Sequence, residues 1–173
     1  MDDAYLGGER SGPPGRGAKG KTPFVAAVET TEDGRPHQII LRRVTAFSKF
    51  ALRKLASTAL SSGAEVVSDG LACFAAVTEA GCTHTPIVTG GGPKAAKTPA
   101  FKWVNTALGN IKSALGATYR AVREKHVPRY LAEFEYRFNR RYDLAAMIPR
   151  LAYVALSYAP MPYRLLKLAD LQA

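Results

Sequence analysis

Three acidic positions, far apart in the sequence, have the residue type and the predicted location of metal ligands. Asp2 stands beside Asp3 at the start of the chain, Asp69 ends the apolar run AEVVSD, and Glu133 lies at the edge of an apolar helix pattern. Carboxylates that converge from strands and a helix can hold two Mg²⁺ ions for phosphoryl transfer, because Mg²⁺ prefers carboxylate oxygens and leaves positions for substrate phosphate. The alternative is that these residues form turns and caps, as Asp at a strand end commonly does.

A second candidate site is the octet GRGAKGKT, which fits the pattern of a nucleotide-binding P-loop. In a P-loop a strand delivers the glycines and a helix begins at the Lys-Thr pair, so that backbone N–H groups converge on phosphate. Here Pro23 and the β-forming run TPFVAAVET follow Lys21, and no strand pattern precedes Gly15. We therefore predict no ATP binding. We predict instead a basic loop that contacts DNA backbone phosphates through Arg16, Lys19 and Lys21.

The helix pattern RYLAEFEYRFNRR carries polar residues on both sides of its apolar stripe. Glu133, Arg137 and Arg140 follow at i, i+4 and i+7 and share one flank. Glu135 and Asn139 share the other flank. The first flank is spaced for an exposed ion pair, which contributes a few tenths of a kcal/mol. The same spacing suits a metal ligand followed by cations that hold DNA phosphates, and composition does not choose between the two.

The composition is that of a globular and strongly basic chain. Its 173 residues are 47% hydrophobic and 22% charged, and the formal net charge is +10. A chain of this length can bury a core without disulfides or metals, so we expect one domain over residues 1–173. The charge favours DNA or another polyanion as partner. A solvated basic surface without a partner is the alternative.

Cysteine usage and hydropathy indicate the cellular compartment. Cys73 and Cys82 are too few for a disulfide framework and too far apart for a Cys-x-x-Cys zinc site, so we expect buried thiols in a reducing cytosol. No apolar run reaches the ~20 residues that span a bilayer, and the first residues do not form a signal-peptide pattern. We expect a cytoplasmic, nucleoid-associated protein with no membrane partner.

The periodicity of the apolar residues predicts an α/β fold with a mixed sheet and helices packed on it. Leu131, Phe134, Phe138 and Tyr142 recur at helical spacing and are expected to form a core stripe. Strands are predicted at residues 2–6, 22–30, 37–44, 64–70 and 84–88, with a hairpin turn at EDGRP. Helices are predicted at residues 48–60, 71–80, 100–115 and 129–141. A flexible basic loop is expected at 7–21, and a helical tail at 143–173 with two short helices broken around Pro149 and Pro160.

Several of these motifs occur together in the order of a known family. The chain resembles the catalytic domain of insertion-sequence transposases of the ISXO-like group, within the DDE superfamily, in the motifs DDAYLGG, GRGAKGKTPFVAAVE, VVSDGLACF, WVNTALGNIKSALGATYRAV and RYLAEFEYRFNRRYDL. The resemblance runs from Asp2 to about Lys167. It implies an RNase H-like mixed sheet with flanking helices. It also implies Mg²⁺-dependent DNA cleavage and strand transfer, in which Mn²⁺ can substitute.

The resemblance further implies a catalytic triad of two Asp and a third residue, which is Glu in some subgroups and Asn in others. The residues that match are Asp2, Asp69 in the motif SDG, and Glu133, which would together hold two Mg²⁺ ions. Asn139 in RFNRR is the rival for the third position. Glu133 is favoured because Arg140 follows seven residues later and because a carboxylate carries full charge for a hard cation.

The partners implied by the resemblance are transposon-end and target DNA, with a homo-oligomer assembled on them. Phosphates would be held by the basic loop and by Lys112, Arg137 and Arg140. Relatives carry a zinc-ribbon and helix-turn-helix region that this sequence does not show, and the first strand begins at Asp2, so we expect weak strand transfer by this chain. The alternatives are a catalytically inactive DNA-binding or oligomerising remnant of a transposase, and a basic nucleic-acid-binding protein without enzymatic ancestry.

Overall fold

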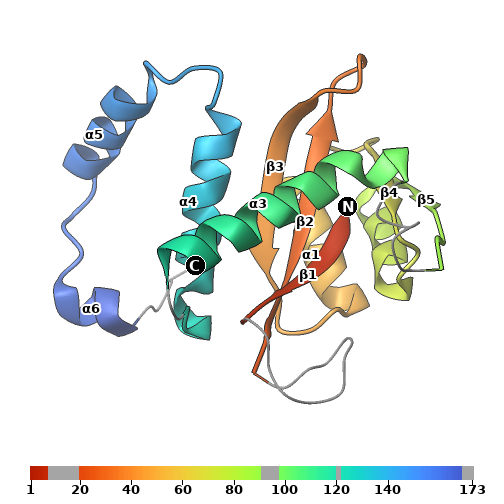
Figure 1. Ribbon diagram of the computed structural model, residues 1–173, viewed down its shortest axis with the longest axis horizontal. Coiled ribbons are helices and arrows are strands. Elements are labelled where there is room, and N and C mark those ends of the chain that lie inside the picture. The colour runs from red at the N-terminus through yellow and green to blue at the C-terminus, as the bar shows by residue number, and fades with distance from the viewer. Residues whose placement is uncertain (8–19, 91–97, 120–121, 169–173) are drawn as a thin grey trace.

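The first three strands form an antiparallel sheet in the computed structural model (Figure 1), which describes residues 1–7, 20–90, 98–119 and 122–168. Strands β1 (Asp2–Leu6), β2 (Thr22–Thr30) and β3 (Pro36–Arg43) pair in that order, with Asp2 opposite Ala26 and Ala26 opposite Leu41. The predicted strands and their hairpin are confirmed, and the predicted mixed α/β class is confirmed with them. No helix begins after Lys21, because Thr22 opens β2.

Alternation along β2 places its side chains on two faces of the sheet. Phe24 and Ala26 are fully buried in one hydrophobic cluster, and Val25 between them is fully buried in another. Because successive side chains of a strand point to opposite faces, β2 is covered on both sides. A strand buried on both faces needs helices above and below it, and the rest of the chain supplies them.

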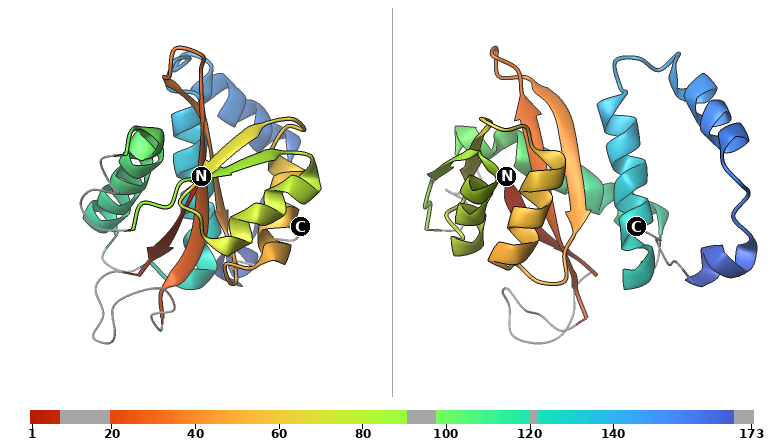
Figure 2. Two further views of the ribbon diagram at one scale, coloured as in Figure 1. Left: turned by 90° about the vertical axis from the view of Figure 1, so that its right-hand side faces the viewer. Right: turned by 180° about the vertical axis from the view of Figure 1, so that it is seen from behind.

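One face of the sheet is covered by α1 (Lys49–Ala59) and by η1 (Ala72–Ala80) (Figure 2). Ser48 caps α1 by accepting a hydrogen bond from the backbone N–H of Ala51. The helix predicted at residues 71–80 is present as a 3₁₀-helix, which ends at Gly81 with a left-handed φ of 81°. Leu52 of α1 and Phe74 of η1 are fully buried against Val25.

The other face is covered by α3 (Lys102–Thr118) and α4 (Val127–Asn139), which follow the 3₁₀ turns η2 (Pro99–Phe101) and η3 (Glu124–His126). Ile111 of α3 and Leu131 of α4 are almost completely buried in the same cluster as Phe24. The helix α3 packs across β1 and β2, whereas α4 packs on β3. The two helices therefore lie at different positions along the sheet.

The strands β4 (Glu65–Ser68) and β5 (Thr83–Pro86) pair in a second, parallel sheet, and η1 connects them in the chain. It adjoins the first sheet at the start of β1, where the amino group of Met1 donates to the carbonyl of Val67 at 2.7 Å. The end of β4 and the start of β1 are therefore side by side, although more than sixty residues separate them in sequence. This junction positions the candidate site.

The chain after α4 forms two short helices, α5 (Met147–Ser157) and α6 (Tyr163–Leu168), as predicted. Pro149 does not break a helix, because it lies in the first turn of α5, where a missing N–H costs nothing. Tyr142 does not join the core stripe of Leu131, Phe134 and Phe138, because α4 ends at Asn139 and leaves the Tyr142 side chain 78% exposed. No helix in the described part of the chain is both long enough and apolar enough to cross a membrane.

Candidate metal and DNA site

Three carboxyl groups meet where the two sheets adjoin. Asp2, Asp3 and Asp69 each offer one carboxylate oxygen, and these oxygens lie within 4.8 Å of one another. Asp2 and Asp3 open β1, and Asp69 follows the last residue of β4. The bond between Met1 and Val67 fixes these two chain segments beside each other. The structure thus brings together Asp2 and Asp69, which were predicted from the sequence as metal ligands. It also places Asp3 in the cluster, and Asp3 was not predicted as a ligand.

The turn after β4 fixes the backbone that carries Asp69. The carboxylate of Asp69 accepts a hydrogen bond from the N–H of Leu71 at 3.1 Å, and the hydroxyl of Ser68 accepts one from the N–H of Gly70 at 3.3 Å. Ser68 is fully buried, and its hydroxyl lies 2.9 Å from Nε2 of His84 on β5. Gly70 has a φ of +84°, and a Cβ there would come within 2.8 Å of a Val88 methyl carbon. This position therefore requires glycine.

Burial and mutual repulsion make the cluster receptive to a cation. The pKa of Asp2 is raised to about 6, first by burial and then by the neighbouring charges of Asp3 and Asp69, while the hydrogen bond from the Asp3 backbone N–H opposes the shift. Burial also lowers the pKa of the Met1 amino group. A divalent cation would remove the repulsion among these oxygens. Because all three groups are hard oxygen donors, the set fits Mg²⁺ or Mn²⁺ rather than a thiolate-preferring metal.

Glu133 lies outside this cluster, on α4. Its carboxylate forms an ion pair with Arg137 at 2.7 Å, and both side chains are more than half exposed. Because α4 packs on β3, the strand β2 lies between α4 and β1. The helix that packs against β1 is α3. The structure therefore does not bring Glu133 to Asp2 and Asp69.

Asn139, the rival for the third position, is also occupied elsewhere. Its side-chain amide accepts from the N–H of Ile39 at 2.7 Å and donates to the carbonyl of Ile39 at 2.9 Å. On the same flank, Glu135 accepts from the N–H of Leu41 at 2.8 Å and pairs with Arg42. This flank attaches α4 to the outer edge of β3. The sequence could not reveal this role, because only the tertiary fold makes β3 the edge strand.

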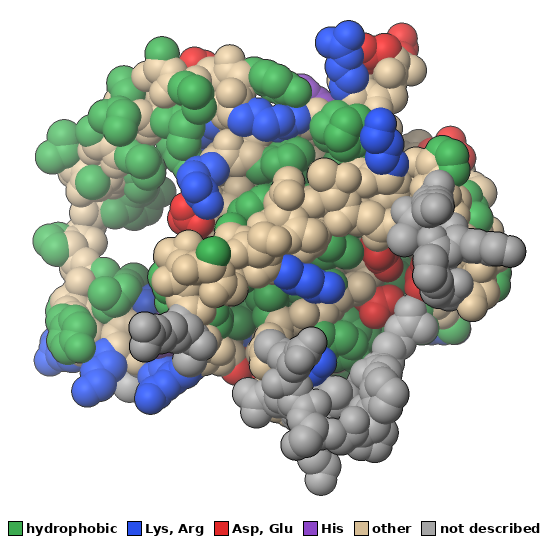
Figure 3. Space-filling view, viewed as in Figure 1, with side chains coloured by type: hydrophobic (Ala, Val, Ile, Leu, Met, Phe, Trp, Pro, Cys, Tyr) green, Lys and Arg blue, Asp and Glu red, His purple; other side chains and the backbone are tan. Residues whose placement is uncertain are grey.

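The predicted DNA-contacting residues lie on several elements. Lys21 is half-buried just before β2, and Lys112 is exposed on α3. Arg137 pairs with Glu133, and the Arg140 guanidinium lies 4.1 Å from the centre of the Tyr136 ring. Figure 3 shows Lys and Arg side chains around α3 and α4, with acidic side chains emerging beside α3. Arg16 and Lys19 lie outside the described residues.

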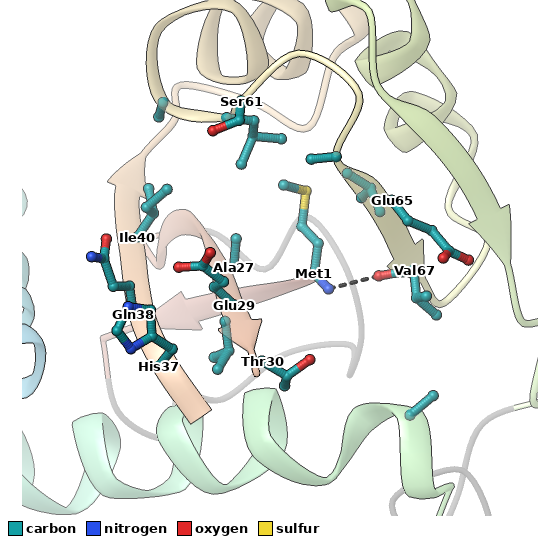
Figure 4. Close-up of a pocket in the computed structure, with 16 residues that line it drawn as sticks. Met1, Ala27, Glu29, Thr30, His37, Gln38, Ile40, Ser61, Glu65 and Val67 are labelled. Atoms are coloured by element: carbon teal, nitrogen blue, oxygen red, sulfur yellow. Dashed lines mark hydrogen bonds between the residues drawn. The ribbon is translucent and has the colours of Figure 1, made fainter. Parts of the chain in front are cut away.

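A cavity of about 500 Å³ lies next to the junction of the sheets. It is bounded by the second half of β2, the first half of β3, the end of α1 and β4. The Met1 side chain projects into it (Figure 4). Its wall shares Met1 and Val67 with the junction but includes neither Asp2 nor Asp69. The acidic cluster is thus separate from this cavity.

Comparison with known proteins identifies the domain. Residues 1–139 match the family model of the ISXO2-like transposase domain. The match includes every strand, the acidic cluster and α4, and it ends before α5 and α6. No curated protein matches the chain.

Proposed function

Because the chain belongs to the ISXO2-like transposase domain family, we propose that it catalyses metal-dependent cleavage and strand transfer of DNA at the ends of an insertion sequence. The observation that carries the proposal is the convergence of Asp2 and Asp69 from two strands that are far apart in sequence. Acidic groups that only cap turns would not need to meet at one point. A basic chain that holds such a cluster is suited to bring DNA phosphates to bound metal.

In this proposal Asp2 and Asp69 hold Mg²⁺ or Mn²⁺, and Asp3 stands beside them. When bound, the metal supplies activation of water or a 3′-hydroxyl and stabilises charge on the attacked phosphate. Ser68, Gly70 and His84 keep the Asp69 turn in place through the contacts described above. The assignment of Glu133 as third ligand, with Asn139 as its rival, rests on the family resemblance alone.

The arrangement of strands supports the RNase H-like part of the proposal. The order β3-β2-β1 continues to β4-β5 through the hydrogen bond between Met1 and Val67. Helices cover both faces of the first sheet. This arrangement places the acidic cluster between the sheets, at the junction of an antiparallel and a parallel pair.

The test is metal-dependent nicking of a supercoiled plasmid that carries the ends of the element. We expect nicking with Mg²⁺ or Mn²⁺ and none with EDTA. Asp69→Asn should lower the rate at least about 100-fold, since even a 1 Å misplacement of a catalytic group can cost that much. The matched control is Asp33→Asn, because Asp33 is exposed in the hairpin turn and pairs only with Arg35 and Thr31 among the described contacts.

Nicking that persists in Asp69→Asn would contradict the site. DNA binding without metal-dependent nicking, in a wild-type protein that is folded, would instead support the inactive remnant. Glu133→Gln addresses the third ligand separately, because a ligand at this position should be as sensitive as Asp69, whereas the ion pair with Arg137 alone gives no reason for a loss.

A further inference from the structure

The chain beyond α4 exposes an unusual amount of apolar surface. We define the C-terminal arm as residues 142–167, which include α5 and most of α6. Twelve large hydrophobic side chains of the arm are at least 43% exposed, among them Ile148, Leu151, Tyr153 and Leu156. Elsewhere in the described residues, only Phe50 and Val88 among the large hydrophobic side chains are exposed to this extent, and Tyr119 is 38% exposed. The apolar surface of the molecule is therefore concentrated in one segment.

The helix α5 is apolar around its whole circumference. Its sequence MIPRLAYVALS has one charged residue, Arg150, and none of its side chains is buried. A helix that is hydrophobic all round is normally enclosed by other structure. An isolated helix of 11 residues is also too short to be stable by itself in water. We therefore expect the apolar side chains of α5 to pack against another protein surface.

The rest of the chain covers little of the arm. Hydrogen bonds join the two: Tyr136 donates to the carbonyl of Met147 at 3.1 Å, and Arg129 donates to the carbonyl of Leu166 at 2.7 Å and lies 3.7 Å from the sulfur of Met161. Between these contacts the arm stands away from α4 (Figure 1), and the space-filling view shows an opening beside α5. The arm is thus anchored at both ends while its apolar side chains remain uncovered.

The exposed area matches what a stable dimer needs. If each side chain is assigned roughly 150 Å², the lower end of the range for aromatic side chains, the twelve residues present at most on the order of 1,000 Å² per chain. A standard protein interface buries about 800 Å² per partner, and monomers rarely expose apolar patches larger than about 600 Å². A helix of 11 residues cannot span a bilayer, which needs about 20.

We propose that the C-terminal arm is a dimerisation element, which packs against the arm of a second copy of this chain in a two-fold symmetric contact. A self-complementary apolar surface meets this requirement, because the same patch serves both partners. The arm follows the segment that matches the transposase family, so the contact would be an addition to that domain. The net charge of +10 on each chain opposes the association, and salt should relieve this repulsion.

The test is sedimentation equilibrium of the whole chain over a range of concentrations, in about 0.5 M salt and without DNA or metal. We expect a monomer–dimer equilibrium. Leu156→Glu should raise the dissociation constant at least tenfold, because it places a charge in an apolar contact. Leu156 is 88% exposed, so the substitution should leave the monomer folded. The matched control is Phe50→Glu on α1, where the side chain is 66% exposed and dimerisation should not change.

Amide hydrogen exchange gives a second readout. Residues 147–157 should exchange more slowly in concentrated than in dilute protein, and this difference should vanish in Leu156→Glu. A monomer at every concentration would overturn the proposal, as would equal dissociation in Phe50→Glu. Co-sedimentation of a monomeric protein with phosphatidylserine vesicles would also overturn it and would assign the arm to membrane surfaces. Since neither DNA nor metal is present, the result does not depend on the proposed catalytic activity.

Discussion

At the scale of single residues, the acidic cluster shows a conflict between stability and ligand binding. Asp2 is partly buried beside Asp3 and Asp69, and this environment raises its pKa from 3.8 to about 6. A raised pKa in a carboxyl group means that the folded state binds the proton more tightly than the unfolded state does. Ionisation of Asp2 therefore destabilises the metal-free fold at neutral pH. A bound cation would reverse the sign of this contribution.

The first prediction is that Asp2→Asn stabilises the metal-free protein. In EDTA, the destabilisation by Asp2 should develop as pH rises from about 4 to about 6 and then remain constant, with an upper limit of about 3 kcal/mol. Asp2→Asn should therefore raise the Tm at pH 7.5 and have little effect at pH 4. The Asn side chain keeps an oxygen that can accept from the Asp3 backbone N–H. Scanning calorimetry at the two pH values measures both effects.

Asp33→Asn is the control for this prediction, because Asp33 is exposed and should show no comparable pH-dependent gain. Addition of Mg²⁺ should raise the Tm of the wild type more than that of Asp2→Asn. A destabilised Asp2→Asn variant at pH 7.5 would mean that the repulsion within the cluster is compensated by contacts of the ionised Asp2 side chain.

At the scale of elements, the attachment of α4 to β3 depends on two polar side chains. Asn139 binds both backbone groups of Ile39, and Glu135 accepts from the N–H of Leu41. These side chains pair with backbone groups along the outer edge of β3, which would otherwise be an unpaired sheet edge. The C-terminal end of α4 is thereby fixed, and α5 begins eight residues later.

The second prediction concerns this attachment. Asn139→Ala should lower the free energy of unfolding by about 2–3 kcal/mol, because it leaves the N–H and the carbonyl of Ile39 without their partner. Glu133→Ala on the same helix is the matched comparison and should cost less than about 0.5 kcal/mol, because its ion pair is exposed. Urea denaturation measures both variants. Equal losses would show that Asn139 contributes no more than a surface ion pair.

The elements themselves were largely predictable from the sequence. The β-forming run TPFVAAVET predicted β2 with its bounds, and the apolar spacing over residues 48–60 predicted α1. The 3₁₀ geometry of η1 was not predictable from apolar spacing, which does not separate it from an α-helix. Tyr142 was misplaced because its spacing continues the stripe of α4 beyond the residue at which that helix ends.

The candidate site was predictable only where strand ends define it. Asp2 and Asp69 were selected from their positions at predicted strand ends and from the family resemblance, and the structure brings these two residues together. The location of Glu133 depends on which strand α4 packs against. The spacing of apolar residues along the sequence does not determine this long-range contact. The same applies to Asn139, whose partner is one hundred residues away in sequence.

At the scale of the whole molecule, the helices on either side of the first sheet give it two faces. The helices α3 and α4 cover one face of the sheet and carry Lys112 and Arg137, and Arg140 follows the last residue of α4. The other face carries α1 and η1, where Arg53 forms an exposed ion pair with Glu79 at 3.2 Å. If DNA binds to the face formed by α3 and α4, then replacing an ion-paired arginine on that face should weaken DNA binding. Replacing an ion-paired arginine on the face formed by α1 and η1 should not.

The last prediction is that DNA binding depends strongly on salt and on the arginines of α4. The logarithm of the binding constant should fall linearly with the logarithm of salt concentration, with a slope of about −0.9 for each phosphate neutralised. Replacing both Arg137 and Arg140 by Ala should flatten the slope by roughly one unit per lost contact. Arg53→Ala is the matched control, because Arg53 is about as exposed as Arg137 and is likewise ion-paired. Fluorescence anisotropy with labelled duplex DNA measures the slopes. An equal change in Arg53→Ala would show that binding follows net charge rather than the α3 and α4 face, and a slope near zero would remove the electrostatic argument for DNA altogether.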